Sequence, residues 1–187
     1  MDGRKSTGTV RALGPVPVSG TIADLPRLKS VRAGKTPWTL EVVWKDGSCS
    51  IVDLTGLVHR SRHFRRFLDQ PLAFRRVKVV DWGAGIGWDN GLDYSADTLR
   101  IVADEQQPLS GKDLVAFEAA NDLNSAETAA LFDVSERTVR DYRSSERLPQ
   151  AVALALRAMR SSATVLDAHY RPTTRRPRGR PRKTGSD

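Results

Sequence analysis

Hydrophobic residues fall on every second position in part of the first half of the chain and recur at helical spacing in the second half. Between residues 38 and 45 the alternation is typical of a strand with one buried face. Asp46 and Gly47 follow, and an Asp-Gly pair supplies the positive φ angles of a tight primed turn. Residues 48–53 are therefore predicted to return as a partner strand, with Cys49 and Ile51 pointing inward.

The rest of the first half predicts further short elements. Residues 54–68 are interpreted as short helical pieces, 74–82 and 85–88 as two strands, and 95–102 as a short helix or an extended exit capped by Ser95. Asn90 and Gly91 mark another turn. The four tryptophans are in or beside these strands and are assigned to the core: Trp38, Trp44, Trp82 and Trp88.

After Pro108 the apolar spacing becomes helical and predicts four helices. The third begins at Glu136 and ends near Ser144. Serines are expected to cap the first three helices and a proline to lie in the first turn of the fourth: Ser110, Ser125, Ser135 and Pro149. The predicted fold class is α+β, with a small α+β domain at 26–105, an all-α domain at 109–168, a flexible amino-terminal arm at 1–25 and a disordered basic tail at 171–187.

Charge is concentrated at the carboxyl end. The formal net charge is +8, and residues 171–187 hold seven Lys or Arg against one Asp, which leaves +2 for the remainder. A basic chain of this kind favours a polyanionic partner, and nucleic acid is the default partner.

Several classes of protein are disfavoured by what the sequence lacks. No run approaches the roughly 18 apolar residues of a membrane span, so no membrane partner is expected. The single cysteine, Cys49, cannot form an internal disulfide and suits a reducing compartment. We expect a cytoplasmic, nucleoid-associated protein. The sequence suggests no nucleophile with a base, metal set or phosphate loop, so we predict no enzyme activity, cofactor or metal site.

The centre of the tail is nearly palindromic, since Pro177 and Pro181 flank an Arg-Gly-Arg core. The prolines keep the backbone extended, and the glycine lets it lie against the floor of a narrow A/T-rich minor groove. The tail resembles the AT-hook family. That resemblance implies minor-groove contacts from Arg178, Gly179 and Arg180, and phosphate contacts from Arg175, Arg176, Arg182 and Lys183. The alternative is a solvated polycation.

The segment from Ser125 to Pro149, SAETAALFDVSERTVRDYRSSERLP, resembles the Cro/repressor helix-turn-helix family. Asp133 occupies the turn position that family members usually fill with glycine, and Asp tolerates a left-handed backbone better than most residues. The resemblance implies base contacts from Glu136, Arg137 and Asp141, and phosphate or helix-start contacts from Asn124, Ser125, Ser135, Thr138, Arg140 and Arg143. The alternative is an ordinary helical bundle with a solvated charged face.

Residues 28–103 resemble the bacterial domain of unknown function 2442. The resemblance is carried by KDG at 45–47, VDL at 52–54, FRRFLDQPLAFRRVKV at 64–79 and WDNGLDYSADTLR at 88–100. It implies a compact α+β domain found in bacterial and phage regulators, often beside a helix-turn-helix, and in some toxin-antitoxin gene pairs. It implies no catalytic residues.

Together these features predict a sequence-specific DNA-binding transcriptional regulator that represses its own operon. Because one helix-turn-helix contacts little DNA, we expect a homodimer on an inverted repeat with half-sites roughly 34 to 36 Å apart. Two alternatives stay open. The chain is an antitoxin that neutralises a cognate toxin protein and also represses its promoter, or it is an architectural protein that binds A/T-rich DNA without choosing a sequence.

Overall fold

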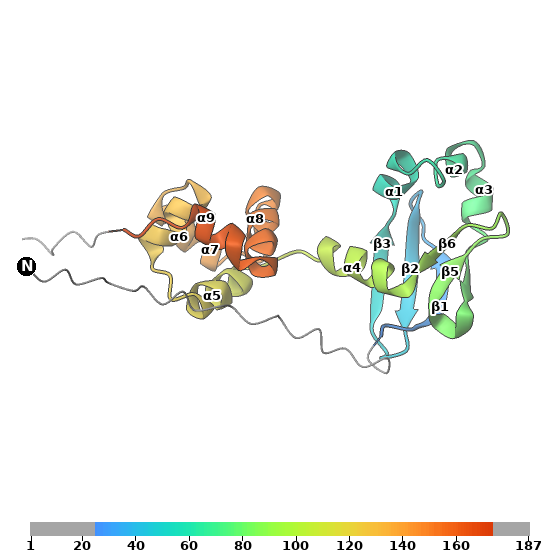
Figure 1. The fold of residues 1–187 in the computed structure, drawn as a ribbon, viewed down its shortest axis with the longest axis horizontal. Helices are drawn as coiled ribbons and strands as arrows, with labels where there is room; N and C mark the ends of the chain where they lie inside the picture. The colour runs from blue at the N-terminus through green and yellow to red at the C-terminus, as the bar shows by residue number, and fades with distance from the viewer. Residues whose placement is uncertain (1–24, 174–187) are drawn as a thin grey trace, which may run out of the picture. The chain divides into compact units, whose positions relative to one another are not determined.

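The computed structural model describes residues 25–173, and the chain divides after Gln106 into two compact units. Figure 1 shows the elements of each unit. The predicted arm, apart from Leu25, and the predicted tail beyond Thr173 lie outside the described residues.

The first unit opens with a three-stranded antiparallel sheet in the order β1-β2-β3. The strands are β1 (Leu28–Ala33), β2 (Thr39–Trp44) and β3 (Cys49–Asp53). Leu40, Val42 and Trp44 are buried on one face of β2, which confirms the alternation expected there. The strand β1 was not anticipated, because its sequence LKSVRA has little apolar alternation.

The predicted facing of β3 is wrong by one residue. Val52 pairs with the inward-facing Leu40, whereas Ile51 pairs with Glu41 and is 70% exposed. Side chains alternate along a strand, so burying Val52 places Ile51 and Cys49 on the opposite face. The turn also differs from expectation. Only Gly47 of the Asp-Gly pair has a positive φ, 88°, and the Trp44 N–H donates to the Ser48 carbonyl, so three residues rather than two connect the strands.

A second antiparallel sheet has the order β4-β5-β6. Its strands are β4 (Lys78–Val80), β5 (Gly85–Gly87) and β6 (Asp93–Ser95), and the 3₁₀ turn η2 (Asp81–Gly83) connects the first two. The expected strand at 74–82 is thus shorter, and β6 was not anticipated. The helices of this unit are α1 (Thr55–Arg60), α2 (Arg66–Asp69), α3 (Pro71–Phe74) and α4 (Ala96–Gln106). The α+β class of the described residues is confirmed.

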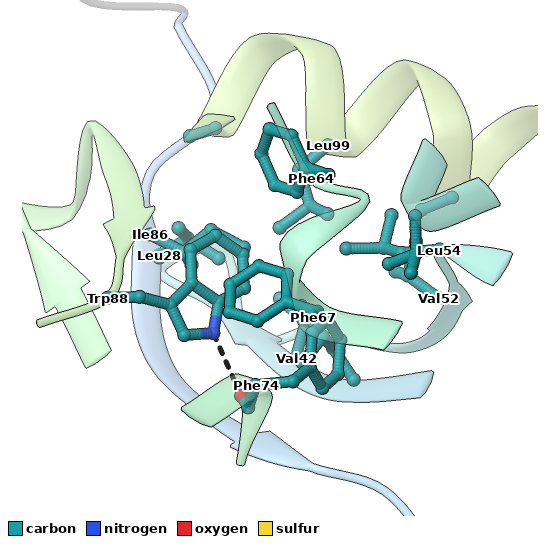
Figure 2. Packing of buried hydrophobic residues seen from close by; sticks show 14 of the residues in the cluster. Leu28, Val42, Val52, Leu54, Phe64, Phe67, Phe74, Ile86, Trp88 and Leu99 are labelled. Carbon is teal, nitrogen blue, oxygen red and sulfur yellow. Dashed lines mark hydrogen bonds between the residues drawn. The ribbon is translucent and has the colours of Figure 1, made fainter. Parts of the chain in front are cut away.

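An aromatic cluster fills the core of the first unit (Figure 2). The rings of Phe64, Phe67 and Phe74 lie 5.1 to 5.7 Å from that of Trp88, centroid to centroid. Trp88 Nε1 donates to the Phe74 carbonyl at 2.8 Å, so the one polar atom of this indole is satisfied. Trp82 was wrongly assigned to the core, since it is 91% exposed on a left-handed turn with φ 53°.

The second unit is helical throughout its regular structure. Its helices are α5 (Gly111–Ala120), α6 (Ser125–Phe132), α7 (Glu136–Arg143), α8 (Gln150–Ser161) and α9 (Ala163–His169). Leu114, Phe117, Leu148 and Leu156 are buried in its core. The short helix α9 was not anticipated.

Two of the four predicted helix starts of the second unit follow the sequence signals and two are shifted by one residue. The Ser110 N–H and hydroxyl both donate to Asp113 at the start of α5. Ser135 caps α7 as predicted, accepting the Thr138 N–H at 3.1 Å. Asn124 rather than Ser125 caps α6, because its side chain reaches two free backbone N–H groups of the first turn. Pro149 lies just before α8 rather than inside it.

Candidate functional site

Helices α6 and α7 are joined by a three-residue turn that Asp133 begins. Asp133 is left-handed (φ 52°, ψ 49°), as its place in the turn predicted, and the Val134 N–H donates to the Ala129 carbonyl at 2.9 Å. Ala129 is 6% exposed and Val139 is fully buried, so each of the two helices buries a small or a branched apolar side chain. The left-handed turn and its backbone bond to Ala129 set how α7 follows α6.

One face of α7 is exposed along its whole length. Val139 is buried and Tyr142 and Arg143 are half-buried, whereas the residues on the other face are exposed. These exposed residues are Glu136, Arg137, Arg140 and Asp141, followed by Ser144 at the helix end. We call them the α7 stripe. These positions recur every three or four residues, the spacing that places side chains on one side of a helix.

The α7 stripe carries two uncommitted cations. Within residues 25–173, the guanidinium groups of Arg137 and Arg140 make no hydrogen bond or ion pair. A guanidinium presents five N–H donors in a planar fork, which can form two parallel hydrogen bonds with a phosphate or with two acceptors on one base edge. Arg137 and Arg140 can therefore bind an anionic or acceptor-rich surface without breaking a bond to any residue in 25–173.

Arg143 is placed differently from the other two arginines. Its Nε donates to Glu118 Oε2 at 2.8 Å and its Nη2 to Glu118 Oε1 at 2.9 Å, a bidentate ion pair with a residue that is 6% exposed. The same Nη2 donates to the Ser125 hydroxyl at 3.0 Å. The bond to Glu118 raises the pKa of Arg143 above its ordinary value. Arg143 thus links α7 to α5 and to the start of α6.

The first residue of α5 lies directly against the end of α7. A Cβ on Gly111 would come within 2.2 Å of the Arg143 carbonyl oxygen and 2.4 Å of the Tyr142 carbonyl oxygen. The Gly111 N–H donates to the Ser145 carbonyl at 2.8 Å. Only glycine leaves room for this approach of two backbones.

A second carboxylate, Glu127, collects bonds at the start of α6. Glu127 Oε2 accepts the Asn124 N–H at 3.0 Å, and Oε1 accepts the Tyr170 hydroxyl at 2.8 Å. These two donors, with the Asn124 N–H first, hold the pKa of Glu127 below its ordinary value.

The structure brings most of the predicted contact residues of the second unit together around α6 and α7. The Asn124 side-chain oxygen is used in capping, and the Thr138 hydroxyl is 2.9 Å from the Ser135 hydroxyl. Seven predicted contact residues lie outside the described residues: Arg175, Arg176, Arg178, Gly179, Arg180, Arg182 and Lys183.

Sequence reasoning missed three residues of this region: Glu118, Glu127 and Tyr170. Glu127 follows the Asn124 cap by three positions, and that spacing is the capping-box signature, so a signal was present. The partners of Glu118 and Tyr170 are distant in sequence, so no local pattern indicates them.

The described residues hold neither a metal-binding cluster nor a membrane-spanning helix. In residues 25–173 no three His, Cys, Asp or Glu side chains are grouped so that they could hold a metal ion. None of the helices in the same range has both the length and the apolar character that crossing a bilayer requires.

Comparison with known proteins bears mainly on the first unit. Residues 28–101 match the family model described as "Protein of unknown function (DUF2442)", which confirms the expected resemblance of that segment. A crystal structure described as "Putative DNA Binding Protein NE0471", from Nitrosomonas europaea, is 25% identical over 84% of this chain and 96% of that chain, with a TM-score of 0.41. No curated protein matches the chain.

Proposed function

We propose that this chain is a sequence-specific DNA-binding transcriptional regulator that represses its own operon. In this proposal α6, its turn and α7 form a helix-turn-helix, and α7 enters the major groove. The observation that carries the proposal is the α7 stripe, because it presents two guanidinium groups that bond to no residue of the described range 25–173, on a helix that is held by its neighbours. In this proposal the chain binds DNA rather than catalysing a reaction.

The residues of the stripe take different roles in this proposal. Arg137, in the first turn of α7, donates to guanine O6 and N7, and Glu136 accepts from cytosine N4. Asp141 faces base edges one turn further along, and Arg140 contacts phosphate. Asn124, Ser135 and Thr138 lie at two helix starts, and the backbone N–H groups that their capping bonds leave unused face phosphates.

Arg143 and Ser125 have another role in the proposal. Both would have to give up bonds with Glu118 or with each other to reach a phosphate. We therefore assign them to holding α7 in place rather than to contacting DNA. This modifies the contact set that the family resemblance implies.

The basic tail adds a second contact in the proposal. Its seven cations favour DNA phosphates, and its Arg-Gly-Arg core fits an A/T-rich minor groove beside the site that α7 reads. Helix α7 is only eight residues long, so one copy covers few base pairs. We propose a homodimer on an inverted repeat, associated with the nucleoid.

The experiment begins by selecting bound fragments from random DNA with the full chain. Affinities for the selected site and for a scrambled duplex are then compared for wild type, Arg137→Ala and the control Lys35→Ala. The control removes one exposed positive charge from the first unit. A lost bidentate base contact is worth about 1–3 kcal/mol of discrimination.

Arg137→Ala should therefore reduce the preference for the selected site by roughly 5- to 150-fold, whereas Lys35→Ala should leave it unchanged. Affinity should also fall steeply with salt, because phosphate contacts release counterions. Equal preference in wild type and Arg137→Ala would refute the assignment of α7 as the reading helix.

One observation favours a second candidate, the antitoxin. Trp82 exposes 91% of its surface, and exposed tryptophans are enriched among residues that dominate protein interfaces. Its carbonyl is held by Lys45 Nζ at 3.1 Å, and Gly83 packs on the Leu28 backbone, so the backbone of the turn that carries the exposed indole is held in place. Copurification with the product of a neighbouring toxin gene, lost in Trp82→Ala, would support this candidate over a regulator that acts alone.

A further inference from the structure

We propose that the first unit has a DNA-binding surface of its own, which contacts the phosphates of double-stranded DNA without reading the sequence. We call this surface the arginine cluster, and it consists of Arg60, Arg62, Arg65, Arg66, Arg75 and Arg76. The choice of DNA as the polyanion rests on the proposed function, which assigns the first unit no contact with DNA.

Positive charge is concentrated in one short segment of the first unit. Residues 60–76 hold six arginines against one acid, Asp69, which is a net charge of +5 with histidine neutral. Residues 25–106 hold 13 Lys or Arg against 10 Asp or Glu, so the rest of this unit has a net charge of −2. The excess of positive charge in the first unit therefore comes from the arginine cluster.

Buried aromatic side chains anchor this segment and leave its arginines on the surface. Phe64, Phe67 and Phe74 point into the core (Figure 2), and the ring centroids of the first two are 6.0 Å apart and those of the last two 5.4 Å apart. The arginine pairs 65–66 and 75–76 directly follow two of these phenylalanines and are exposed. Helices α1, α2 and α3, which hold most of the segment, lie next to one another at one end of the unit (Figure 1). The core thus holds the backbone that carries the cluster.

The guanidinium groups of the cluster have few partners in the described part of the chain. Within residues 25–173, five of them make no hydrogen bond or ion pair: Arg60, Arg62, Arg65, Arg66 and Arg75. Arg76 lies near Asp89, whose carboxylate already binds Lys78 Nζ at 2.8 Å.

Three other cations of the first unit are paired with carboxylates. Arg32 pairs with Glu41, and Arg100 pairs with Asp46, as Lys78 does with Asp89. Like charges that lie close together without partners repel one another and destabilise the folded unit, and a bound polyanion removes this repulsion. The contrast between paired and unpaired cations therefore indicates an anionic partner for the cluster.

DNA phosphates suit the cluster better than an acidic protein surface does. All six cations between residues 60 and 76 are arginine, whose planar guanidinium can form two parallel hydrogen bonds with a phosphate. A protein interface usually has an apolar centre, whereas Leu72 is the one large hydrophobic side chain that residues 60–76 expose. Protein–DNA interfaces are more polar and more positively charged than protein–protein interfaces, as this surface is.

The salt dependence of binding gives the expected magnitude. Each phosphate contact that is lost lowers the slope of log affinity against log salt concentration by about 0.9. Removing two contacts therefore lowers the slope by about 1.8, so the variant should lose about 12-fold less affinity than wild type between 50 and 200 mM salt.

The experiment measures the affinity of the full chain for a random-sequence duplex and for the selected site over this range of salt. The test variant, Arg65→Gln with Arg66→Gln, removes two charges of the cluster. A second variant, Arg65→Lys with Arg66→Lys, keeps both charges. The matched control, Lys29→Gln with Lys35→Gln, removes two exposed charges of the same unit outside the cluster.

The glutamine variant should show a slope lower by about 1.8 on both duplexes and keep the preference of wild type for the selected site. The lysine variant and the control should keep the wild-type slope. Tryptophan fluorescence checks that each variant is folded, because Trp88 packs on Phe64 and Phe67.

A folded glutamine variant with the wild-type slope would overturn the inference and favour an acidic protein as the partner of the cluster. A lysine variant or a control that loses as much slope as the glutamine variant would also overturn it. Failure of wild type to select any site would refute the proposed function instead, and the slopes on the random-sequence duplex would still decide on the cluster.

Discussion

Replacing Arg143 by methionine tests whether the buried ion pair holds α7 in position. Methionine keeps much of the apolar stem of arginine and removes the guanidinium. The change leaves the Glu118 carboxylate, whose side chain is 8% exposed, without its bidentate partner. It also removes the donor to Ser125, so α7 loses its polar links to α5 and α6 together.

The magnitude follows from the burial of the two partners. Two unit charges 4 Å apart interact by about 4 kcal/mol at an effective dielectric constant of 20. The Arg143 side chain is 29% exposed, so water screens part of this attraction. Breaking a buried pair from one side typically costs about 3–5 kcal/mol, and the exposure of Arg143 lowers our expectation to about 2–4 kcal/mol. Glu118→Gln should cost less, about 1–2 kcal/mol, since the half-buried Arg143 guanidinium can be partly hydrated.

The chain offers an internal control for the assay. All four tryptophans precede residue 107, so tryptophan fluorescence reports unfolding of the first unit alone. Circular dichroism at 222 nm is weighted toward the helices of the second unit. In a urea titration of the full chain, Arg143→Met should shift the dichroism transition to lower urea and leave the fluorescence transition in place.

Two results would refute this reasoning. A loss below about 0.5 kcal/mol in the dichroism transition would mean that the pair is worth no more than an exposed one. A double variant Glu118→Gln with Arg143→Met that costs the sum of the two single changes would mean that the two side chains do not interact.

Gly111→Ala should destabilise the second unit by about 3 kcal/mol in the same titration, because its Cβ would lie 2.2 Å from the Arg143 carbonyl oxygen; an unchanged dichroism midpoint would show that the helices separate freely. Acid should also weaken the second unit through Glu127. Bonds from the Asn124 N–H and the Tyr170 hydroxyl lower the pKa of Glu127 below its ordinary value of 4.5. Its contribution is therefore complete above about pH 4.5 and is lost as pH falls through the lowered pKa, so Glu127→Gln should flatten the acid limb of stability against pH.

The strands and turns of the first unit were only partly predictable from local pattern. The alternation in β2 identified its buried face because one face of the strand is more polar than the other. In β3, Ile51 and Val52 are equally apolar, and only the pairing of Val52 with Leu40 decides which one is buried. The strand β6 is three residues long, too short for an alternation to be recognised. Trp82 shows the same limit, because the left-handed turn that exposes it depends on contacts with Leu28 and Lys45.

The helices of the candidate site could be predicted from the sequence better than the side-chain bonds that hold these helices together. Ser135 is a helix cap and Asp133 is the left-handed residue of the turn, and both can be recognised from residues close by in the sequence. Arg140 and Arg143 are both arginines on α7, and no local sequence pattern distinguishes their roles. Glu118, 25 positions from Arg143, distinguishes them, because it accepts the donors of Arg143 while Arg140 stays exposed. The proposed division between arginines that contact DNA and an arginine that orients the helix thus depends on the folded unit, and the Arg143→Met and Arg137→Ala variants test its two sides separately.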